Sequence, residues 1–440
     1  MTKIPETVRD PGRIETLAKQ IKDGLISPTE LLQRYIDRID AVEPLVMAWR
    51  ELCLDNARAE AEVLTREIET GKIRGPLHGI PIGVKDIIDV KGVPTRCNSK
   101  SRADIGPATA DAETVTALRA AGAIILGKTH TTEFAFRDPS PARNPYNLEH
   151  TPGGSSSGSG AAVGAGMVPV ALGTQTMASV NRPAAYCGIA AFKPSTRLMP
   201  GAGVALLSGL YDTVGYYGYQ VADAATVFKA ICPSHARMHG APAYSDALTV
   251  TVLHDPVLET ADDDIQKSMQ QTSKRLKEAG HIVCDQKAPV SFEEIQEWHR
   301  LTMEFEIGRF QRELLGKPEG SVGQYLCEAI ERGMVISEGD YFSARRALDN
   351  ARDTFFDYFP DTDVFLSPAT PKTAPKGLEW TGDASYISPW TALGGPVVTM
   401  PTGLSSENMP IGCLLAGVPG SDYHFASAAR TIAEAAERQT

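Results

Sequence analysis

The sequence is poor in cysteine. Its seven cysteines are spread singly over 440 residues and never occur as C-x-x-C. A disulfide framework needs a denser set in a small chain, and a structural zinc site needs closely paired cysteines. We therefore expect neither in this protein.

Long hydrophobic runs are also missing. The longest apolar stretches are interrupted by glycine or a charged residue well before the ~20 residues that span a bilayer. Residues 1–13 are charged and contain Pro5 and Pro11, a pattern unlike that of a signal peptide. The sequence therefore predicts a soluble, cytoplasmic protein without a membrane partner.

Positive charge is not in excess. Lysine and arginine number 43 against 54 acidic residues, so the net charge is −11. This balance disfavours a nucleic-acid partner, because binding of that kind depends on concentrated positive charge. Hydrophobic residues (42%) and charged residues (22%) lie near the average for globular proteins, which excludes a disordered or fibrous chain.

Helix and strand patterns alternate along the chain. Ser27, Pro28 and Glu30 have the spacing of a capping box with proline at the first helical position, which predicts a helix start. Periodicity predicts further helices at 55–69, 112–121, 263–279, 292–315, 337–358 and 423–437, and strands at 123–126, 167–172, 248–253, 364–366 and 396–400. The alternation predicts an α/β fold in which helices cover a sheet. Because neither a repeat nor a clear linker interrupts it, we expect one large domain over residues 1–440.

Residues 122–129 fit the phosphate-loop template G-x-x-x-x-G-K-[ST]. In a phosphate loop the strand precedes the first glycine, and a flexible loop joins the two glycines. Here the four residues between the glycines are apolar and have the pattern of a strand, while Gly122 ends the preceding helix. We therefore predict no nucleotide site at this segment.

Residues 152–166 are rich in glycine, serine and alanine and carry no charge. One interpretation is a flexible linker. The segment continues, however, into a small-residue helix and then an apolar run, which favours a buried position. Four serines at 155, 156, 157 and 159 would then need hydrogen-bond partners, so we favour a functional polar cluster over a linker.

Three separated motifs together resemble the amidase signature family. Lys85 ends the block Gly-Ile-Pro-Ile-Gly-Val-Lys, Ser155 lies in Gly-Gly-Ser-Ser-x-Gly-Ser, and Ser179 follows Ser155 by 24 residues. Supporting matches occur at 27–39, 127–134 and 388–401. The resemblance implies a single α/β/α sandwich around a mixed, mostly parallel twisted sheet. It also implies that N-terminal helices of about residues 10–70 pack on a catalytic core of about residues 75–230.

The resemblance implies a Ser–cis-Ser–Lys triad. Ser179 would be the nucleophile, Ser155 the bridging acid and base, and Lys85 the general base. A serine hydroxyl needs such a base, and lysine can serve only if burial lowers its pKa from ~10.4. No histidine lies close to either serine in these motifs, and we expect His78, seven residues before Lys85, to be structural.

The family also implies an oxyanion hole, made by the backbone N–H groups of Thr176, Met177, Ala178 and Ser179. Most relatives have Gly-Gly where this chain has Met177 and Ala178. Glycine permits backbone angles that other residues resist, so we expect the loop to keep its path here without a positive φ. We further expect the Met177 side chain to project into the acyl pocket, with a position in the core as the alternative.

Four further residues are expected to support the site or bind substrate: Gly154, Ser156, Gln175 and Arg182. The peptide bond from Gly154 to Ser155 is implied to be cis. Arg182 follows the nucleophile by three positions, as in the malonamidase-like branch, where the arginine pairs with a substrate carboxylate. A structural carbonyl or carboxylate partner is the alternative. A run of tyrosines at 211, 216, 217 and 219 fits either a pocket wall or a core strand face.

The expected function is that of a serine hydrolase that forms an acyl-enzyme. Its substrate would be a small amide-like molecule, such as a carboxamide, anilide, carbamate (urethane) or urea derivative, and water would be the second reactant. The resemblance implies no metal and no cofactor, and we expect a monomer or homodimer. The alternatives are an amidotransferase-type subunit that acts within a partner complex and a catalytically inactive binding relative.

Overall fold

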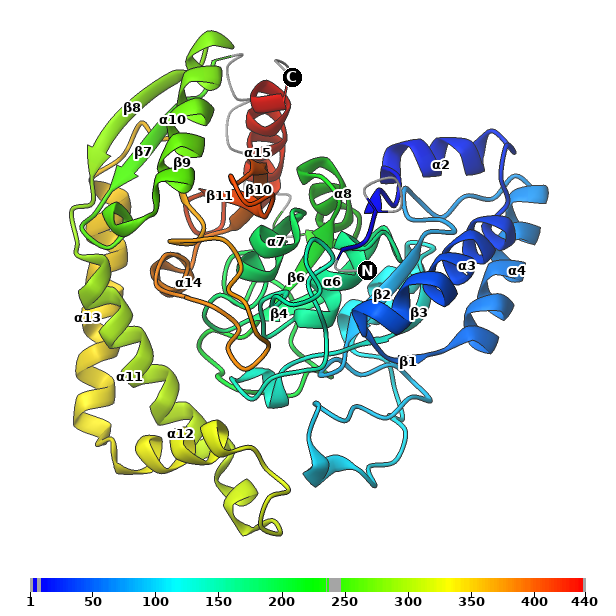
Figure 1. Cartoon of the computed structure of the whole chain (residues 1–440), viewed down its shortest axis with the longest axis horizontal. Helices are drawn as coiled ribbons and strands as arrows, with labels where there is room; N and C mark the ends of the chain where they lie inside the picture. Colours follow the sequence, from blue (N-terminus) through cyan, green and yellow to red (C-terminus); the bar gives the residue numbers. More distant parts are fainter. Residues whose placement is uncertain (1–2, 6–8, 235, 237–246, 438–440) are drawn as a thin grey trace.

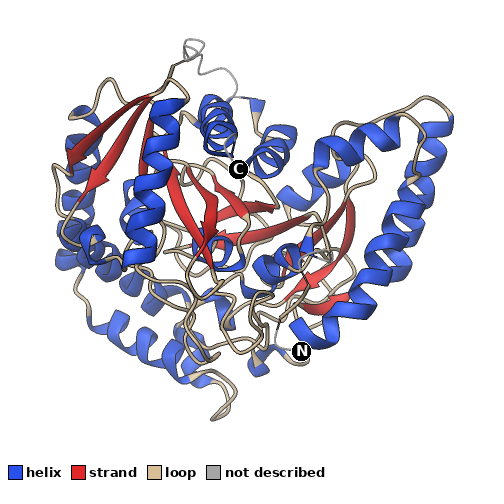
Figure 2. Ribbon diagram, turned by 45° about the horizontal axis from the view of Figure 1, so that its top comes forward, coloured by secondary structure: helices blue, strands red, loops and turns tan. Residues whose placement is uncertain are grey.

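One continuous sheet runs through the molecule with helices on both sides (Figures 1 and 2). The computed structural model describes residues 3–5, 9–234, 236 and 247–437. Within these residues the sheet has 11 strands. In spatial order they are β1 (Trp49–Leu52), β3 (Ile124–Thr129), β2 (Pro81–Lys85), β4 (Val170–Gln175), β6 (Thr213–Gly218), β5 (Ala190–Lys193), β10 (Val397–Leu404), β11 (Pro410–Ala416), β9 (Val364–Pro368), β7 (Thr249–His254) and β8 (Ile282–Lys287).

The sheet is mixed, as expected, but it is not mostly parallel. Among the described strands, four neighbouring pairs are parallel and six are antiparallel. Parallel pairs flank the sheet's antiparallel centre, where β10 and β11 form a hairpin across residues 405–409. A short connection of this kind can join only antiparallel strands. The periodicity indicated the first strand of that hairpin and missed the second. The expectation of a mostly parallel sheet, which the resemblance implied, is therefore wrong for the described strands.

The N-terminal helices cover one end of the sheet, beside β1 to β3 (Figure 1). They are α2 (Ile14–Lys22), α3 (Pro28–Val46), α4 (Leu54–Glu69) and, further along the chain, α5 (Glu113–Ala120). The predicted helix start is confirmed, because Ser27 Oγ accepts from the Glu30 N–H and the Glu30 carboxylate accepts from the Ser27 N–H. α3 and α4 bury Leu32, Ile36 and Leu64 in one hydrophobic cluster with residues of β3.

Helices of the C-terminal half cover the other end of the sheet and extend beyond it. They are α10 (Asp263–Glu278), α11 (Phe292–Phe310), α12 (Gln324–Val335), α13 (Glu338–Asp357), α14 (Ser388–Leu393) and α15 (Asp422–Glu437). α8 (Val221–Ile231) packs on β5 and β6 at the centre of the sheet. α11 and α13 run side by side at the left of Figure 1, and α12 packs against α11 at the lower left. The helix expected over 292–315 ends at Phe310 and continues as a 3₁₀ turn, Arg312–Gly316. None of the helices in the described part of the chain combines the length and the apolar content needed to cross a bilayer.

Two short buried helices fill the centre: α6 (Ser157–Gly164) and α7 (Asn181–Cys187). Every residue of α6 is buried, so the Gly/Ser-rich segment is part of the core and the linker interpretation is wrong. The phosphate-loop match lies on β3, with Gly122 two residues before the strand, as predicted. That residues 1–440 form a single domain stays a prediction. The one continuous sheet is consistent with it.

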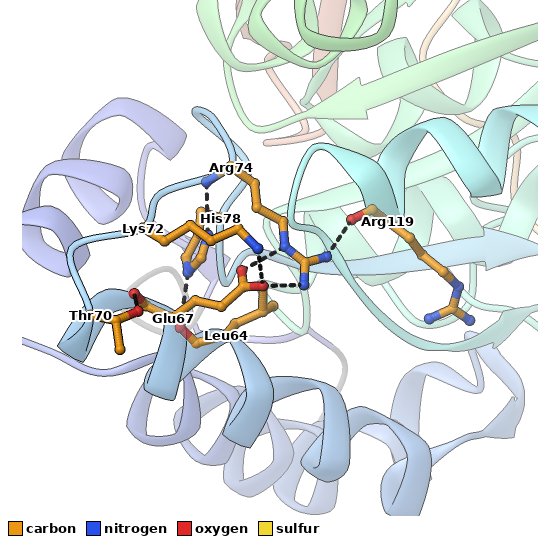
Figure 3. A network of polar contacts seen from close by, with 7 residues as sticks. All are labelled: Leu64, Glu67, Thr70, Lys72, Arg74, His78 and Arg119. Atoms are coloured by element: carbon orange, nitrogen blue, oxygen red, sulfur yellow. Dashed lines mark hydrogen bonds and ion pairs between the residues drawn. The ribbon is translucent and has the colours of Figure 1, made fainter.

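His78 is structural, as expected. Its Nδ1 accepts from the Arg74 N–H at 3.1 Å, and its Nε2 lies 3.0 Å from the carbonyl oxygen of Leu64 on α4. Both ring nitrogens therefore have partners, and burial lowers the pKa of His78. Figure 3 shows the surrounding network, in which Glu67 binds the side chains of Arg74 and Lys72. The ring ties α4 to the segment before β2 and lies outside the catalytic motifs.

Candidate active site

Lys85 is the last residue of β2 and is fully buried. Its Nζ lies 2.8 Å from both Ser155 Oγ and Thr174 Oγ1, and in the protonated form it donates to both. β2 pairs with β4 in parallel, so the end of β2 comes next to Thr174 on β4. Lys85 and Ser155 come from two separate sequence motifs, and the structure brings them into contact. The sequence did not indicate Thr174, because the signal for that residue is the strand pairing and not a motif.

Burial lowers the pKa of Lys85 to about 7, while the nearby Asp212 carboxylate opposes the shift. The charged form of a buried amine loses its hydration, so the neutral form becomes accessible. This is the direction that the apolar neighbours of Lys85 in the sequence predicted. The side chain can therefore carry a lone pair near neutral pH, which a base requires.

Ser155 follows a cis peptide bond from Gly154, as the resemblance implied. Gly154 lies against other segments, since a Cβ atom built on it would come within 2.7 Å of the Thr381 side chain and 3.1 Å of the Thr132 side chain. A larger residue would displace those segments. Glycine is therefore needed at this position for space.

The neighbouring serines of the cluster hold α6 against the sheet. Ser156 Oγ donates to the Thr174 carbonyl and accepts from the Thr174 N–H, both at 3.2 Å. Ser159 Oγ donates to the Leu172 carbonyl at 2.7 Å. These hydroxyls have the partners that burial demands, so Ser156 supports the site while Ser155 faces Lys85.

Ser179 opens into a cavity of about 680 Å³, which we call the Ser179 cavity. Thr176, Met177 and Arg182 also line it. The loop of residues 176–179 connects β4 to α7. Among the described residues, none accepts a hydrogen bond from the backbone N–H groups of 176–179. Four consecutive donors beside a serine hydroxyl and a cavity form a surface that an anionic oxygen could approach.

Met177 and Ala178 adopt no positive φ, so the expectation for the loop's path is confirmed. Ala178 is buried, whereas Met177 is half-buried and lines the Ser179 cavity. Met177 thus lies at the wall of the cavity and not in the core, while its place in an acyl pocket stays a prediction. The loop differs from the Gly-Gly of most relatives in the side chains of these two residues. Its backbone N–H groups still have no acceptor among the described residues.

The side chain of Gln175, the residue before the loop, binds the two residues that follow the loop and Thr391 on α14. Its Oε1 accepts from the N–H groups of Val180 and Asn181 at 2.8 and 2.9 Å. Its Nε2 donates to Asn181 Oδ1 at 2.8 Å and to Thr391 Oγ1 at 2.9 Å. All four hydrogen bonds of the side-chain amide are used, and Gln175 is not among the residues that line the Ser179 cavity. These contacts favour a supporting role for Gln175.

Arg182 is buried, with 7% of its surface exposed. Its guanidinium donates to the Gly154 carbonyl at 2.7 and 3.2 Å, to the Gly382 carbonyl at 2.5 Å and to Thr381 Oγ1 at 2.9 Å. Desolvation lowers its pKa. These contacts favour the structural alternative for Arg182, since oxygen atoms of the fold already occupy most of its N–H groups.

The tyrosine run belongs to the core. Tyr216 and Tyr217 on β6 are fully buried, Tyr211 is 5% exposed, and none of the three lines the Ser179 cavity. Tyr211 packs edge-on against the His299 ring, with 4.2 Å between the ring centroids. The core interpretation thus holds for Tyr216 and Tyr217, which lie in two different hydrophobic clusters. Tyr211 precedes β6, and Tyr219 follows it and is half-buried.

Three residues far from the motifs in sequence contact the 176–179 loop. Asp212 accepts from Thr176 Oγ1 at 2.6 Å, and burial raises the pKa of Asp212 to about 6. His299 Nε2 lies 3.0 Å from the Thr176 carbonyl, and Thr391 Oγ1 lies 2.5 Å from the Met177 carbonyl. These partners are 36, 123 and 214 positions from the loop. Thr391 lies within the supporting match at 388–401, but neither that match nor a local pattern indicated a contact with the loop.

Comparison with known proteins assigns the class. The sequence profile of the Amidase family matches residues 30–425, so this chain belongs to that family. The malonamidase-like branch remains a prediction. A glutamyl-tRNA(Gln) amidotransferase subunit of Clostridium acetobutylicum is 27% identical to this chain, over 95% of this chain and 98% of that protein. The corresponding glutamyl-tRNA(Gln) amidotransferase subunit of Roseiflexus castenholzii is 31% identical, over 90% and 89%.

Solved structures of similar fold include amide-hydrolysing enzymes. Native peptide amidase from Stenotrophomonas maltophilia has a TM-score of 0.80 and 27% identity, covering 97% of this chain and 96% of that one. A chain from a vestigial protein complex, described as revealing the evolutionary origins of an s-triazine catabolic enzyme, has a TM-score of 0.87 and 25% identity, covering 96% and 98%. The α/β fold of this chain is thus that of amidase signature enzymes.

Proposed function

We propose that this protein hydrolyses a C–N bond of a small amide-like substrate through an acyl-enzyme on Ser179. One observation carries the proposal: Lys85 Nζ lies 2.8 Å from Ser155 Oγ in a fully buried position. The next residue, Ser156, donates its N–H to the Ser179 carbonyl at 3.3 Å, which brings this segment next to Ser179. A buried amine hydrogen-bonded to a serine hydroxyl is suited to proton transfer. Membership of the Amidase family supports the same reaction class.

Proton transfer follows the order Ser179, Ser155, Lys85. As Ser179 Oγ attacks the carbonyl carbon, its proton passes to Ser155 Oγ, whose own proton passes to neutral Lys85. The carbonyl oxygen becomes an oxyanion, and the N–H groups of residues 176–179 donate to it. Collapse of this intermediate breaks the C–N bond, while Lys85 returns its proton through Ser155 to the departing nitrogen. Water then repeats the sequence on the acyl-enzyme and releases the acid.

The substrate class follows from this chemistry, and not from an observed ligand. A carboxamide, an anilide, a carbamate (urethane) or a urea derivative presents a carbonyl next to a nitrogen leaving group, and each would react at Ser179. We further propose that the protein acts in the cytoplasm as a monomer or homodimer, with no nucleic acid or membrane as partner. The net charge of −11 supports the absence of a nucleic-acid partner.

The proposal is tested with purified protein and a panel of p-nitroanilides, aryl carbamates and carboxylate-bearing amides. We expect release of the chromophore from at least one class, together with a covalent adduct on the Ser179 peptide by mass spectrometry when a slow substrate is used. Ser179→Ala should show neither. An adduct on another residue, or equal turnover by Ser179→Ala, would exclude this mechanism.

A second candidate is an amidotransferase-type subunit that acts only within a complex. It is favoured by the relatives from Clostridium acetobutylicum and Roseiflexus castenholzii, both of which are amidotransferase subunits. The two functions differ in one measurable respect: the subunit would be inactive until its partners are added. Turnover by the homogeneous chain alone would therefore exclude it, and would also exclude an inactive binding relative.

A further inference from the structure

Two peptide groups of the 176–179 loop are held from behind by side chains. The Thr176 carbonyl lies 3.0 Å from His299 Nε2 on α11, and the Met177 carbonyl accepts from Thr391 Oγ1 on α14 at 2.5 Å. Each carbonyl shares its amide group with the next residue's N–H. The two contacts therefore act on the amides that carry the N–H groups of Met177 and Ala178.

A carbonyl acceptor requires a donor, so His299 Nε2 carries the proton. Its other nitrogen, Nδ1, lies 3.3 Å from the Ser388 hydroxyl, which can donate to it. His299 is fully buried, and burial lowers its pKa to about 4. The ring is thus neutral near pH 7 and fixed in a single tautomer by its two partners.

Thr391 is oriented in the same way. Its hydroxyl accepts from Gln175 Nε2 at 2.9 Å and donates to the Met177 carbonyl. The hydroxyl proton is therefore directed at the loop, and the hydrogen bonds run in one direction from Gln175 through Thr391 to Met177. Chains of this kind polarise their members cooperatively.

A hydrogen bond to an amide oxygen strengthens the N–H donor of the same amide. The N–H groups of Met177 and Ala178 have no acceptor among the residues that the structure describes. Thr176, Met177 and Ser179 line the Ser179 cavity, and Ala178 lies between two of them in the chain, so a ligand in this cavity is the acceptor that we infer for these N–H groups. The added donor strength also acts without movement, because His299 and Thr391 are held before any substrate arrives.

We propose that His299 and Thr391 are positioning residues that orient and polarise the Thr176–Met177 and Met177–Ala178 amides, so that these N–H groups bind the oxyanion of the transition state. This inference rests on the proposed function. Neither side chain touches the substrate in this arrangement. The two side chains stabilise the charged intermediate, whose oxyanion depends most on the N–H donors. They stabilise a neutral bound amide much less.

A pair of substitutions at His299 separates donation from packing. Glutamine can place its amide nitrogen near the position of Nε2, whereas asparagine reaches only the position of Nδ1. We expect His299→Asn to lower kcat by about 10-fold, less than the ~10²–10³ that follows loss of a direct oxyanion donor, with KM changed less than about 2-fold. His299→Gln should recover most of the loss.

Thr391 provides an independent pair. Thr391→Val replaces the hydroxyl with a methyl group of similar size, and Thr391→Ser keeps the donor. We expect Thr391→Val to lower kcat by about 10-fold at nearly constant KM, and Thr391→Ser to stay within about 3-fold of the wild type. If His299→Asn does not fold, this pair decides the question by the same criteria.

The ratio of two inhibition constants is a measurement that a merely structural role of His299 and Thr391 would leave unchanged. A boronic acid that forms a tetrahedral anion on Ser179 mimics the intermediate, while a non-hydrolysable neutral amide analogue mimics the bound substrate. His299→Asn and Thr391→Val should raise the inhibition constant of the boronic acid by about the same factor as they lower kcat. They should leave that of the neutral analogue unchanged.

The inference is overturned if both donor-removing variants keep wild-type kcat. It is also overturned if the two inhibitors weaken equally, or if the glutamine and serine variants fail to restore activity. Failure of the proposed function is distinguishable, because Ser179→Ala would then retain turnover. Loss of turnover in Ser179→Ala with unaffected His299→Asn and Thr391→Val would reject only the positioning role.

Discussion

Lys85 Nζ lies 2.8 Å from the hydroxyl of Thr174, as close as it lies to the hydroxyl of Ser155. The Thr174 carbonyl is also within reach, at 3.5 Å. A neutral lysine has two N–H groups and one lone pair. With both N–H groups directed at Thr174, the lone pair faces Ser155, which is the orientation that a base needs.

This relationship predicts a role for the Thr174 hydroxyl. Thr174→Val removes the hydroxyl at nearly constant volume and should lower kcat by about 10-fold or more, because the Lys85 lone pair is no longer oriented. Thr174→Ser keeps the acceptor and should stay close to the wild type. Steady-state kinetics on the same substrate measure both. Equal activity of the valine and serine variants would contradict the assignment.

Substitution of the triad should nearly abolish turnover. We expect Ser179→Ala to remove measurable activity, Lys85→Ala to lower kcat by several orders of magnitude, and Ser155→Ala to be nearly as damaging, because a serine without a base is a weak nucleophile. Ser157→Ala is the matched control, since Ser157 is equally buried but its hydroxyl pairs with Ser140. Retention of more than a few per cent of kcat by Ser179→Ala would exclude it as the nucleophile.

Activity should rise with pH through the titration of Lys85. Burial lowers its pKa to about 7, and only the neutral form is a base. The neutral fraction therefore increases from pH 6 to pH 8, and kcat/KM at pH 6 should be about 10-fold below its plateau. The measurement is the pH profile of kcat/KM with a neutral substrate.

Substitution of Asp212 tests whether the rising limb of the pH profile belongs to Lys85. The Asp212 carboxylate favours protonated Lys85, so Asp212→Asn should shift the rising limb to lower pH. Asp383→Asn is the control, because Asp383 lines the Ser179 cavity but does not act on the pKa of Lys85. A limb that moves instead with a histidine substitution would identify another base.

Met177 should control the size of the acyl group. Its side chain lines the Ser179 cavity, so Met177→Gly enlarges the pocket and should shift the ratio of kcat/KM between small and bulky acyl groups by about 10-fold. The melting temperature should change little. Met400 is the control, because it is buried in β10 and its replacement by alanine should cost about 2–5 kcal/mol of stability. A large loss of stability in Met177→Gly with unchanged ranking of substrates would contradict this role.

Substitution of Arg182 distinguishes a structural role from a role in substrate recognition. The Arg182 guanidinium holds the Gly154 and Gly382 carbonyls, and lysine cannot reproduce this forked contact. Arg182→Lys should therefore lower the melting temperature and reduce kcat/KM for neutral and carboxylate-bearing amides by similar factors. A loss confined to carboxylate-bearing amides, with normal stability, would instead show that Arg182 binds the substrate.

The sequence by itself determined the local structure around the motifs. The capping box at Ser27 needs only residues three positions apart, and the block that ends at Lys85 is a short apolar run punctuated by glycine and proline. The order and spacing of Lys85, Ser155 and Ser179 were sufficient to indicate the family. Such features depend on neighbours within a few residues, which a sequence displays directly.

Tertiary structure alone decided how the loop before Ser179 is held. Thr174 meets Lys85 through the pairing of β2 with β4, while His299 and Thr391 reach the loop from helices 123 and 214 positions further along the chain. The antiparallel centre of the sheet and the contacts of Arg182 arise in the same way. Packing of distant elements sets these distances, and no local pattern of residues encodes them, because the partners share no periodicity or spacing with the segments that they contact.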